Sequence, residues 1–382
     1  METLGSRLRR DLLLVCALGL TCAYAVYSLY RIITTYAPDF SVFYQSAGNL
    51  VRGVNIYGDP TLYTGLGYPP VSLLPFLPFI LLPYKLAQGI WVVGSFAALL
   101  GSIWVTIVLV EKRISLRRFA WVCMAAFLSF PTKFSLGMGT VNIVALFLLL
   151  FSLRLMGKNR DRKAGLFLAC ALVLKPHFAL LLVPFLHHKQ RAVGVAAVVL
   201  VLMGMIIGGL FGWNLWLEYA VKAAPPLLRF TGKEIYYNQG ISAVFSRLLP
   251  VGQAGVAALA GSILVIAWAY QYMKTHSMTV FKSVAFFMPV LLLVEPLSWQ
   301  HHYVFLLPTF FVVWRALRRK DHWKIALLLA SYILISANIK QPDLLSPSFM
   351  SRIALSHVFW GNMLLLTLYA MVVPAQNRSA RL

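Results

Sequence analysis

The chain has 382 residues, of which 60% are hydrophobic and only 12% are charged, and its mean hydropathy is +0.77. An ordinary soluble domain carries about 25% charged residues, so this composition excludes a soluble globular protein. Many apolar stretches are separated by short basic loops. This pattern is typical of a multi-span membrane protein.

The formal net charge of +23 arises from 34 basic and 11 acidic residues. Such a charge could indicate a nucleic-acid partner, but phosphate binding needs a basic stripe on one continuous solvated face. Positively charged loops stay in the cytoplasm. In the arrangement below, 23 of the 34 basic residues fall in inner loops. The excess of basic residues is therefore a topology signal, and we expect no nucleic-acid partner.

We predict one all-α integral membrane domain over residues 1–382, with about 12 transmembrane helices and both termini inside. The run from Ala164 to Leu186 is interpreted as a hairpin broken at Lys175-Pro176, because proline interrupts a helix and an unpaired lysine at mid-bilayer is costly. The hairpin also places 11 of the 17 downstream basic residues inside. The predicted spans are 12–33, 90–110, 119–130, 142–156, 164–175, 177–187, 192–212, 253–273, 283–297, 302–316, 325–339 and 358–374.

The first of these spans has the outline of a signal peptide, with Arg7-Leu8-Arg9-Arg10 before an apolar run and Ala23-Tyr24-Ala25 after it. Apolar character continues to Ile33, which favours an uncleaved helix. The four cysteines lie in apolar runs without metal-site spacing, so we expect free thiols used for packing.

Three outer segments are long, namely 34–89, 213–252 and 340–357. The first contains a proline-punctuated apolar stretch that is too short for a confident crossing, and it predicts interfacial or re-entrant helices. The second begins with Trp213 and Trp216, which suit a membrane interface. Neither of these two loops is large enough to form an independent domain.

Five ionisable residues share the outer surface in this topology: Asp39, Lys175, Glu295, His301 and His302. Ionisable groups next to apolar spans are costly and usually face a cavity, so their collection at one interface predicts a reaction site there. Each also has a structural interpretation. Asp39 could cap a helix over 40–50, Glu295 could end a helix, Lys175 could snorkel to lipid phosphate, and either histidine could be a packing residue.

A series of short motifs occurs in order along the outer segments: Asp39-x4-Tyr44-x2-Ala47, Gly53-x-Asn55-x-Tyr57, Tyr68-Pro69-Pro70, Gly139-x2-Asn142, Ala164-Gly165, Lys175-Pro176, Asn238-Gln239-x2-Ser242 and Pro296-x-Ser298-Trp299-x-His301-His302-Tyr303. Taken together, these motifs resemble glycosyltransferase family 87 of the GT-C superfamily, the polyprenyl-phosphate-sugar-dependent mannosyltransferases. The chain departs from the family at Gly137-Met138-Gly139, where a glycine–glutamine pair is often found.

The resemblance implies a GT-C fold in the plasma (inner) membrane, a lipid-linked sugar donor, and a glycolipid or glycan acceptor on the extracytoplasmic face. The essential aspartate of the family matches Asp39, and a histidine of its late motif matches His301 or His302. Mannose is the expected sugar, with arabinofuranose or another hexose left open. A multi-span transporter or lipid flippase is the main alternative, and a non-catalytic scaffold is a third.

A sugar leaving from phosphate needs little acid assistance, whereas the acceptor hydroxyl needs a base. We therefore predict Asp39 as general base, one of the two histidines as its positioning partner, and inversion at the anomeric carbon. Lys175 would neutralise the donor phosphate, with Arg229 or Arg352 assisting. No cofactor or metal is expected, because no Asp-x-Asp motif occurs. The predicted substrate-binding residues are Tyr44, Tyr57, Tyr68, Asn142, Asn238, Gln239 and Glu295, although Tyr68 in its Pro-Pro turn and the two asparagines also suit structural roles.

Overall fold

The computed structural model describes residues 4–57, 66–111, 114–230, 233–342 and 348–379. Within these ranges the chain is all-helical, with 18 α-helices and four short 3-10 or π segments. The only β-type pairing among the described residues is an isolated bridge between Asn238 and Trp299. The predicted all-α class is confirmed, and the protein is a membrane protein.

Each of the 12 apolar runs predicted as a span forms helix. Among the described residues, three helices are long and apolar enough to cross a bilayer, namely α3, α9 and α13, and the α4–α5 pair, bent by 68°, makes a fourth candidate. The prediction that all 12 runs cross the membrane stays a prediction. The corresponding elements are α1 (Leu4–Thr34), α3 (Tyr84–Glu111), α4 (Leu116–Leu128) with α5 (Phe130–Met138), α6 (Asn142–Met156), α7 (Asp161–Leu174), η2 (Pro176–Leu181) with α8 (Leu182–His188), α9 (Gln190–Phe211), α13 (Val251–Thr275), α14 (Val280–Val294), η4 (Gln300–Leu306) with α15 (Leu307–Ala316), α16 (His322–Ser336) and α18 (His357–Ser379).

The chain breaks at Lys175-Pro176, as predicted, so a single helix through this lysine is excluded. The second arm differs from the prediction. It consists of the 3-10 segment η2 and the seven-residue helix α8, and α8 is only about 10 Å long. This arm is shorter than the roughly 30 Å needed for a full crossing.

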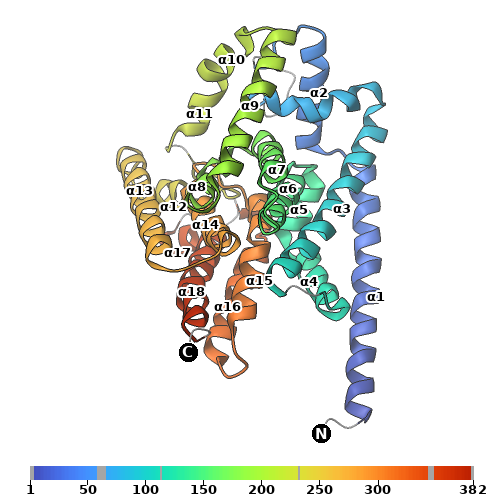
Figure 1. Ribbon diagram of the computed structural model, residues 1–382, viewed down its shortest axis with the longest axis vertical. Helices are drawn as coiled ribbons and strands as arrows, with labels where there is room; N and C mark the ends of the chain where they lie inside the picture. Colours follow the sequence, from blue (N-terminus) through green and yellow to red (C-terminus); the bar gives the residue numbers. More distant parts are fainter. Residues whose placement is uncertain (1–3, 58–65, 112–113, 231–232, 343–347, 380–382) are drawn as a thin grey trace.

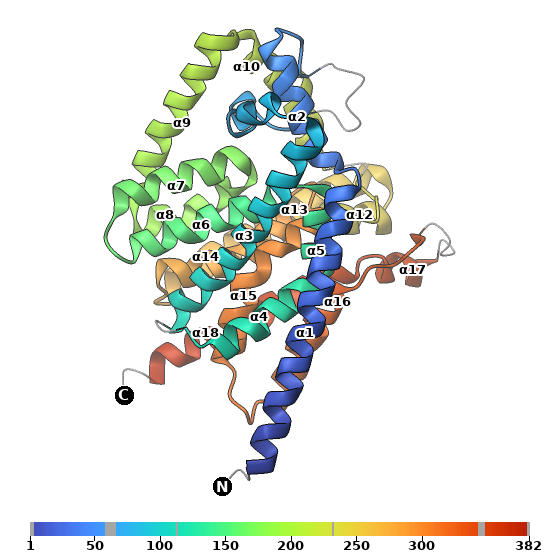
Figure 2. The same ribbon diagram turned by 90° about the vertical axis from the view of Figure 1, so that its right-hand side faces the viewer.

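In segment 34–89, predicted to be the first outer segment, the described residues form α2 (Pro38–Val51) and η1 (Pro70–Leu81). Pro75 and Pro78 interrupt the hydrogen-bond ladder of a regular α-helix, and η1 is a 3-10 segment. In both views α2 lies at the end of the molecule opposite the start of α1 and the end of α18 (Figures 1 and 2). An even number of crossings fits this arrangement of the termini.

The described residues of the other two segments predicted to be outer, 213–252 and 340–357, form short helices. The second holds α10 (Asn214–Glu218), the π-segment η3 (Tyr219–Ala223), α11 (Ala224–Leu228) and α12 (Ile241–Leu248), and the third holds α17 (Phe349–Ala354). The four cysteines are free, as predicted, but Cys16 and Cys22 are exposed on α1 and do not pack in the core.

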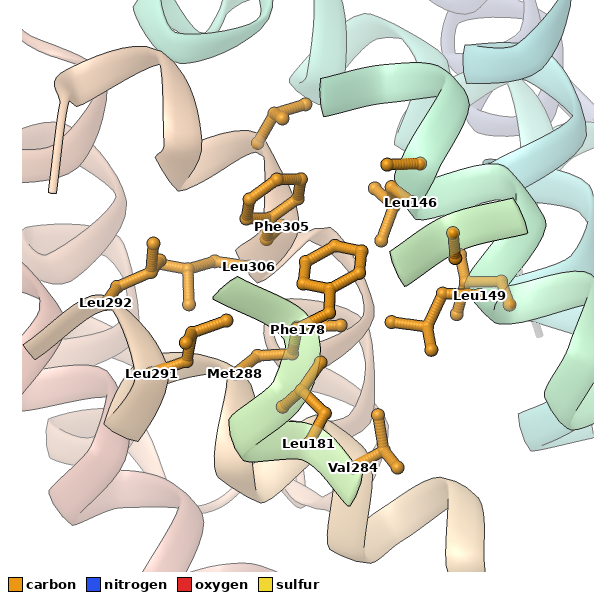
Figure 3. Packing of buried hydrophobic residues seen from close by; sticks show 14 of the residues in the cluster. Leu146, Leu149, Phe178, Leu181, Val284, Met288, Leu291, Leu292, Phe305 and Leu306 are labelled. Carbon is orange, nitrogen blue, oxygen red and sulfur yellow. The ribbon is translucent and has the colours of Figure 1, made fainter. Parts of the chain in front are cut away.

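An apolar cluster supports the region where α6, η2, α14 and η4 meet (Figure 3). At its centre the Phe178 and Phe305 rings meet edge to face, with 4.8 Å between their centroids. Leu146 and Met288 pack around them. The Phe305 ring also lies 5.9 Å from the Lys175 ammonium group, so the apolar cluster packs directly against the polar residues around Lys175.

Gly139 brings the end of α5 against the start of α2. It has a positive φ of 69°, which favours glycine. A β-carbon at this position would lie 2.8 Å from the Phe40 Cβ and 3.1 Å from the Ala37 Cβ. The Trp91 indole donates to the Gly139 carbonyl at 2.9 Å and fixes this contact. The conformation of this glycine thus helps to place Asp39, which lies between Ala37 and Phe40.

Candidate active site

Lys175 lies at the break between α7 and η2. Proline disfavours the helical conformation in the residue before it, and Lys175 accordingly has φ −141° and ψ 83°. Its side chain is buried, with 1% exposure. The sequence therefore places a cation at a helix end inside the protein, where it needs polar partners. The snorkelling interpretation does not fit this burial.

Two side chains accept hydrogen bonds from the Lys175 ammonium group. The Tyr68 hydroxyl lies at 3.1 Å and the His302 Nε2 at 2.8 Å. An ammonium group has three N–H donors, so one remains for a ligand. Burial lowers the pKa of Lys175 to about 8, although the carboxylates of Glu295 and Asp39 oppose the shift. Lys175 is still mostly protonated at neutral pH.

The contacts of His302 determine its tautomer. Because Nε2 accepts from Lys175, the ring proton is on Nδ1, which lies 3.2 Å from the Glu295 Oε2 and donates to it. The other Glu295 oxygen pairs with the His177 Nδ1. Glu295 thus holds two imidazoles at once. This position orients His302, and the predicted substrate contact of Glu295 stays a prediction.

His177 belongs to this cluster but was not among the sequence candidates. Its position two residues after Lys175, across Pro176, was the available signal. The nitrogen and oxygen atoms of His177, Glu295 and His302 lie within 4.8 Å of one another, close enough to hold a metal ion. In the tautomer described above, the Nδ1 of His302 carries a proton that a bound metal would have to displace.

His301 faces different neighbours. Its ring lies 6.2 Å from Trp299 in a stacked arrangement and 5.2 Å from Phe134 edge to face. Its carbonyl accepts from Ser135 at 2.8 Å and from the Asn142 amide at 3.4 Å. Of the two adjacent histidines, only His302 is brought to Lys175 and Glu295. Asn142 holds the backbone of η4 in this position.

Asp39 lies in the first turn of α2, directly after Pro38. Ala37 is the N-cap residue and no side chain caps the helix, so the capping interpretation of Asp39 is wrong. Burial raises the pKa of Asp39 to about 6, and the nearby Lys175 charge partly opposes this rise. No hydrogen bond reaches its carboxylate from the residues the structure describes. Asp39 is therefore a carboxylate of raised basicity that is available to a ligand.

Tyr68 links the first outer segment to Lys175. Burial, with smaller effects from Asp39 and Glu295, raises the pKa of Tyr68 well above its ordinary value. The phenol therefore keeps its proton, and since its oxygen accepts from Lys175 the proton is available to a ligand. The Tyr57 hydroxyl donates to the Tyr68 carbonyl and the Tyr44 hydroxyl to the Leu82 carbonyl, both at 2.8 Å. These two tyrosines brace the segment that carries Tyr68.

Asn238 and Gln239 are engaged with backbone groups. The Asn238 amide donates to the Pro296 carbonyl at 3.0 Å and accepts from the Ser298 amide at 2.8 Å. The Gln239 amide donates to the Leu355 carbonyl at 2.8 Å. Both side chains join the second outer segment to the loop before η4, and their predicted contact with substrate stays a prediction.

The two predicted helper arginines lie apart from this cluster. Arg229 and Arg352 are exposed, and Arg352 donates to the Arg247 carbonyl at 2.9 Å. In the described ranges neither contacts Lys175, Tyr68 or His302. The structure thus brings Asp39, Lys175, Tyr68, His302 and Glu295 together and leaves both arginines outside.

The sequence is similar to known proteins over most of its length. The family model of glycosyltransferase family 87 matches residues 66–296, more than half of the chain. A polyprenol-phosphate-mannose-dependent alpha-(1-2)-phosphatidylinositol mannoside mannosyltransferase of Mycobacterium tuberculosis (strain ATCC 25618 / H37Rv) is 26% identical over 360 residues, covering 87% of this chain and 83% of that protein. A protein with the same description from Mycolicibacterium smegmatis (strain ATCC 700084 / mc(2)155) is 23% identical over 332 residues, covering 78% and 74% respectively.

Proposed function

Because this chain belongs to glycosyltransferase family 87, we propose that it transfers a hexose, mannose by preference, from a polyprenyl-phosphate donor to a glycolipid or glycan acceptor. The two mycobacterial relatives are described as polyprenol-phosphate-mannose-dependent and as acting on phosphatidylinositol mannoside. The observation that carries the proposal is the buried Lys175 ammonium, fixed by Tyr68 and His302 and close enough to Asp39 to influence its pKa. A base and a phosphate-binding cation thus share one site.

In the proposed reaction, Asp39 removes the proton of the acceptor hydroxyl while the hydroxyl oxygen attacks the anomeric carbon. The bond between that carbon and the phosphate oxygen breaks, and polyprenyl phosphate leaves with the electron pair. The free N–H of Lys175 and the Tyr68 hydroxyl stabilise the charge that builds on this oxygen. Attack opposite the leaving group inverts the anomeric configuration. One carboxylate is sufficient, whereas glycosidases use two.

His302 is a positioning residue in this proposal. It fixes Lys175 through Nε2 and is itself fixed by Glu295 through Nδ1. We expect His302→Ala to lower kcat/KM for the donor roughly 100-fold, because a displaced cation stabilises the leaving group poorly. His301→Ala, which removes a ring packed on Trp299 and Phe134, should stay within about tenfold of wild type. If both variants lost kcat/KM for the donor equally at saturating acceptor, the positioning role would not belong to His302 alone.

We further propose a GT-C architecture in the plasma (inner) membrane, with about 12 membrane segments in a single domain, of which the η2–α8 arm is too short to cross alone. Segment 34–89 would supply interfacial helices, and the active site would face the extracytoplasmic side. In a cysteine-free background, Val54→Cys and Lys340→Cys, both at exposed positions, should react with a membrane-impermeant maleimide in intact cells. Lys158→Cys and Arg319→Cys, also exposed, should react only after permeabilisation. Labelling of all four from one side would contradict this orientation.

The transfer reaction itself is tested with purified protein in liposomes that contain polyprenyl-phosphate-mannose and a phosphatidylinositol mannoside. We expect a product heavier by one hexose in the mass spectrum and a stoichiometric release of polyprenyl phosphate. Turnover should persist in EDTA, because the proposed mechanism assigns stabilisation of the leaving phosphate to Lys175 and Tyr68. Movement of the donor between leaflets without a new glycosidic bond would instead support a transporter or flippase.

A further inference from the structure

A second basic site lies outside the cluster around Lys175. A cleft of about 270 Å³ opens between the last turns of α1 and the bent α4–α5 pair, which lie side by side in Figure 2. Aromatic and aliphatic side chains, including Tyr24, Phe127 and Leu136, form most of its wall. Two basic residues, Arg31 and Lys133, also line it. The cleft therefore combines an apolar surface with two positive charges.

The two positive charges have no compensating acid. No acidic residue lines the cleft, and neither Arg31 nor Lys133 forms an ion pair with any residue in the described ranges. The Lys133 ammonium lies 5.6 Å from the centre of the Tyr24 ring, which positions it over the cleft. Arg31 is exposed and Lys133 is half-buried, so an anion that enters the cleft can approach both charges. A phosphate attached to a lipid fits both the charge and the apolar walls.

Both walls of this cleft lead to α2, the helix that carries Asp39. Arg31 lies in the last turn of α1, eight residues before Asp39, and the carbonyls of Ile32 and Thr35 are held by the Gln88 amide at 2.9 and 2.7 Å. On the other wall, α5 carries Lys133 and ends at the Gly139 contact with α2. Each cation therefore lies on an element that connects directly to the start of α2.

From these observations we infer that the cleft between α1 and α5 binds the phosphate of an anionic glycolipid acceptor through Arg31 and Lys133. The inference rests on the proposed function, in which the acceptor hydroxyl must reach Asp39 and the donor phosphate pairs with Lys175. Two phosphate-bearing substrates then have two separate sets of cations. The acyl chains of the acceptor would lie against the aromatic walls on the lipid side of α1 and α4.

The kinetic test uses Arg31→Gln and Lys133→Gln in lipid nanodiscs, with polyprenyl-phosphate-mannose as donor and phosphatidylinositol mannoside as acceptor. Each variant should raise the acceptor KM about tenfold, the loss expected for one charge-assisted hydrogen bond, while the donor KM stays unchanged. Arg31→Lys should restore most of the affinity, which separates lost charge from poor folding. Lys340→Gln, at an exposed basic residue, is the matched control and should leave both KM values unchanged.

A binding measurement that needs no turnover accompanies these kinetics. In native mass spectrometry, wild type should retain phosphatidylinositol more strongly than glucosyl diacylglycerol, which has a sugar but no phosphate. Arg31→Gln should abolish this difference. Loss of phosphatidylinositol binding with an unchanged acceptor KM would show a site for bulk lipid and overturn the inference, as would unchanged binding. Absence of mannosyl transfer in the wild type would instead refute the proposed function. The lipid-binding measurement would still show whether Arg31 holds a phosphate, because it does not depend on turnover.

Discussion

Replacement of Asp39 by Asn should lower kcat roughly 1,000-fold while the protein still inserts and folds. The asparagine amide has the same shape as the carboxylate but cannot remove the proton from the hydroxyl of the acceptor substrate. General-base catalysis typically raises a reaction rate 100- to 10,000-fold. No hydrogen bond from the described residues depends on this carboxylate, so the thermal unfolding temperature should not fall. Unchanged mannosyl transfer in this variant would remove Asp39 from the mechanism.

The pH dependence gives a second measure of the same group. Burial raises the pKa of Asp39 to about 6, and the base acts in its deprotonated form. Activity of the wild type should therefore fall as the pH drops through 6 and be highest between about 6 and 8. The residual activity of Asp39→Asn should lack this acid limb. Retention of the limb in the variant would assign it to another group.

Replacement of Lys175 by Met should lower kcat/KM for the donor roughly 100- to 1,000-fold, the range for loss of one preorganised electrostatic contact at a developing charge. Methionine has a similar length and is apolar, so it suits a position with 1% exposure. We expect a higher donor KM and a lower kcat together, because the ammonium binds the phosphate in the ground state and more strongly as it leaves. Measurement requires donor titration at saturating acceptor.

The alkaline side of the pH profile belongs to the same lysine. Its pKa is lowered to about 8 by burial, and only the protonated form donates to phosphate. Activity should fall as the pH rises through 8 in the wild type, whereas Lys175→Met should show no such limb. Lys340→Met is the control for loss of an exposed positive charge. An unaltered donor KM in Lys175→Met would contradict the phosphate-binding role.

Local rules predicted much of the helical pattern. Proline chemistry located the break at Lys175-Pro176, and proline spacing located the irregular stretch that became η1. Apolar run length found all 12 helical runs but could not show which of them cross, because helices such as α6 and α14 have only 15 residues. Crossing depends on tilt and neighbours, which sequence length does not specify.

The sequence predicted which residues form the site better than it predicted the contacts between them. Asp39, Lys175, Glu295 and the histidine pair were expected on one surface, but adjacent histidines can be distinguished only when their helix is known. Here η4 is a 3-10 helix, with three residues per turn, and His302 shares a face with Phe305 below Lys175. The roles of Asn238 and Gln239 in holding distant backbone carbonyls depend on tertiary contacts that no local motif encodes.

The glycine at the end of α5 has a consequence for how this enzyme can vary. Gly139 contributes no functional group, yet it sets the close approach of α5 to the start of α2, where Asp39 lies. A single added methyl group there would push α2 away and displace Asp39, the proposed base, without changing one charge or hydrogen-bonding atom. Substitutions at Gly139 are therefore limited by the room between α5 and α2, even where they change no charge or hydrogen bond.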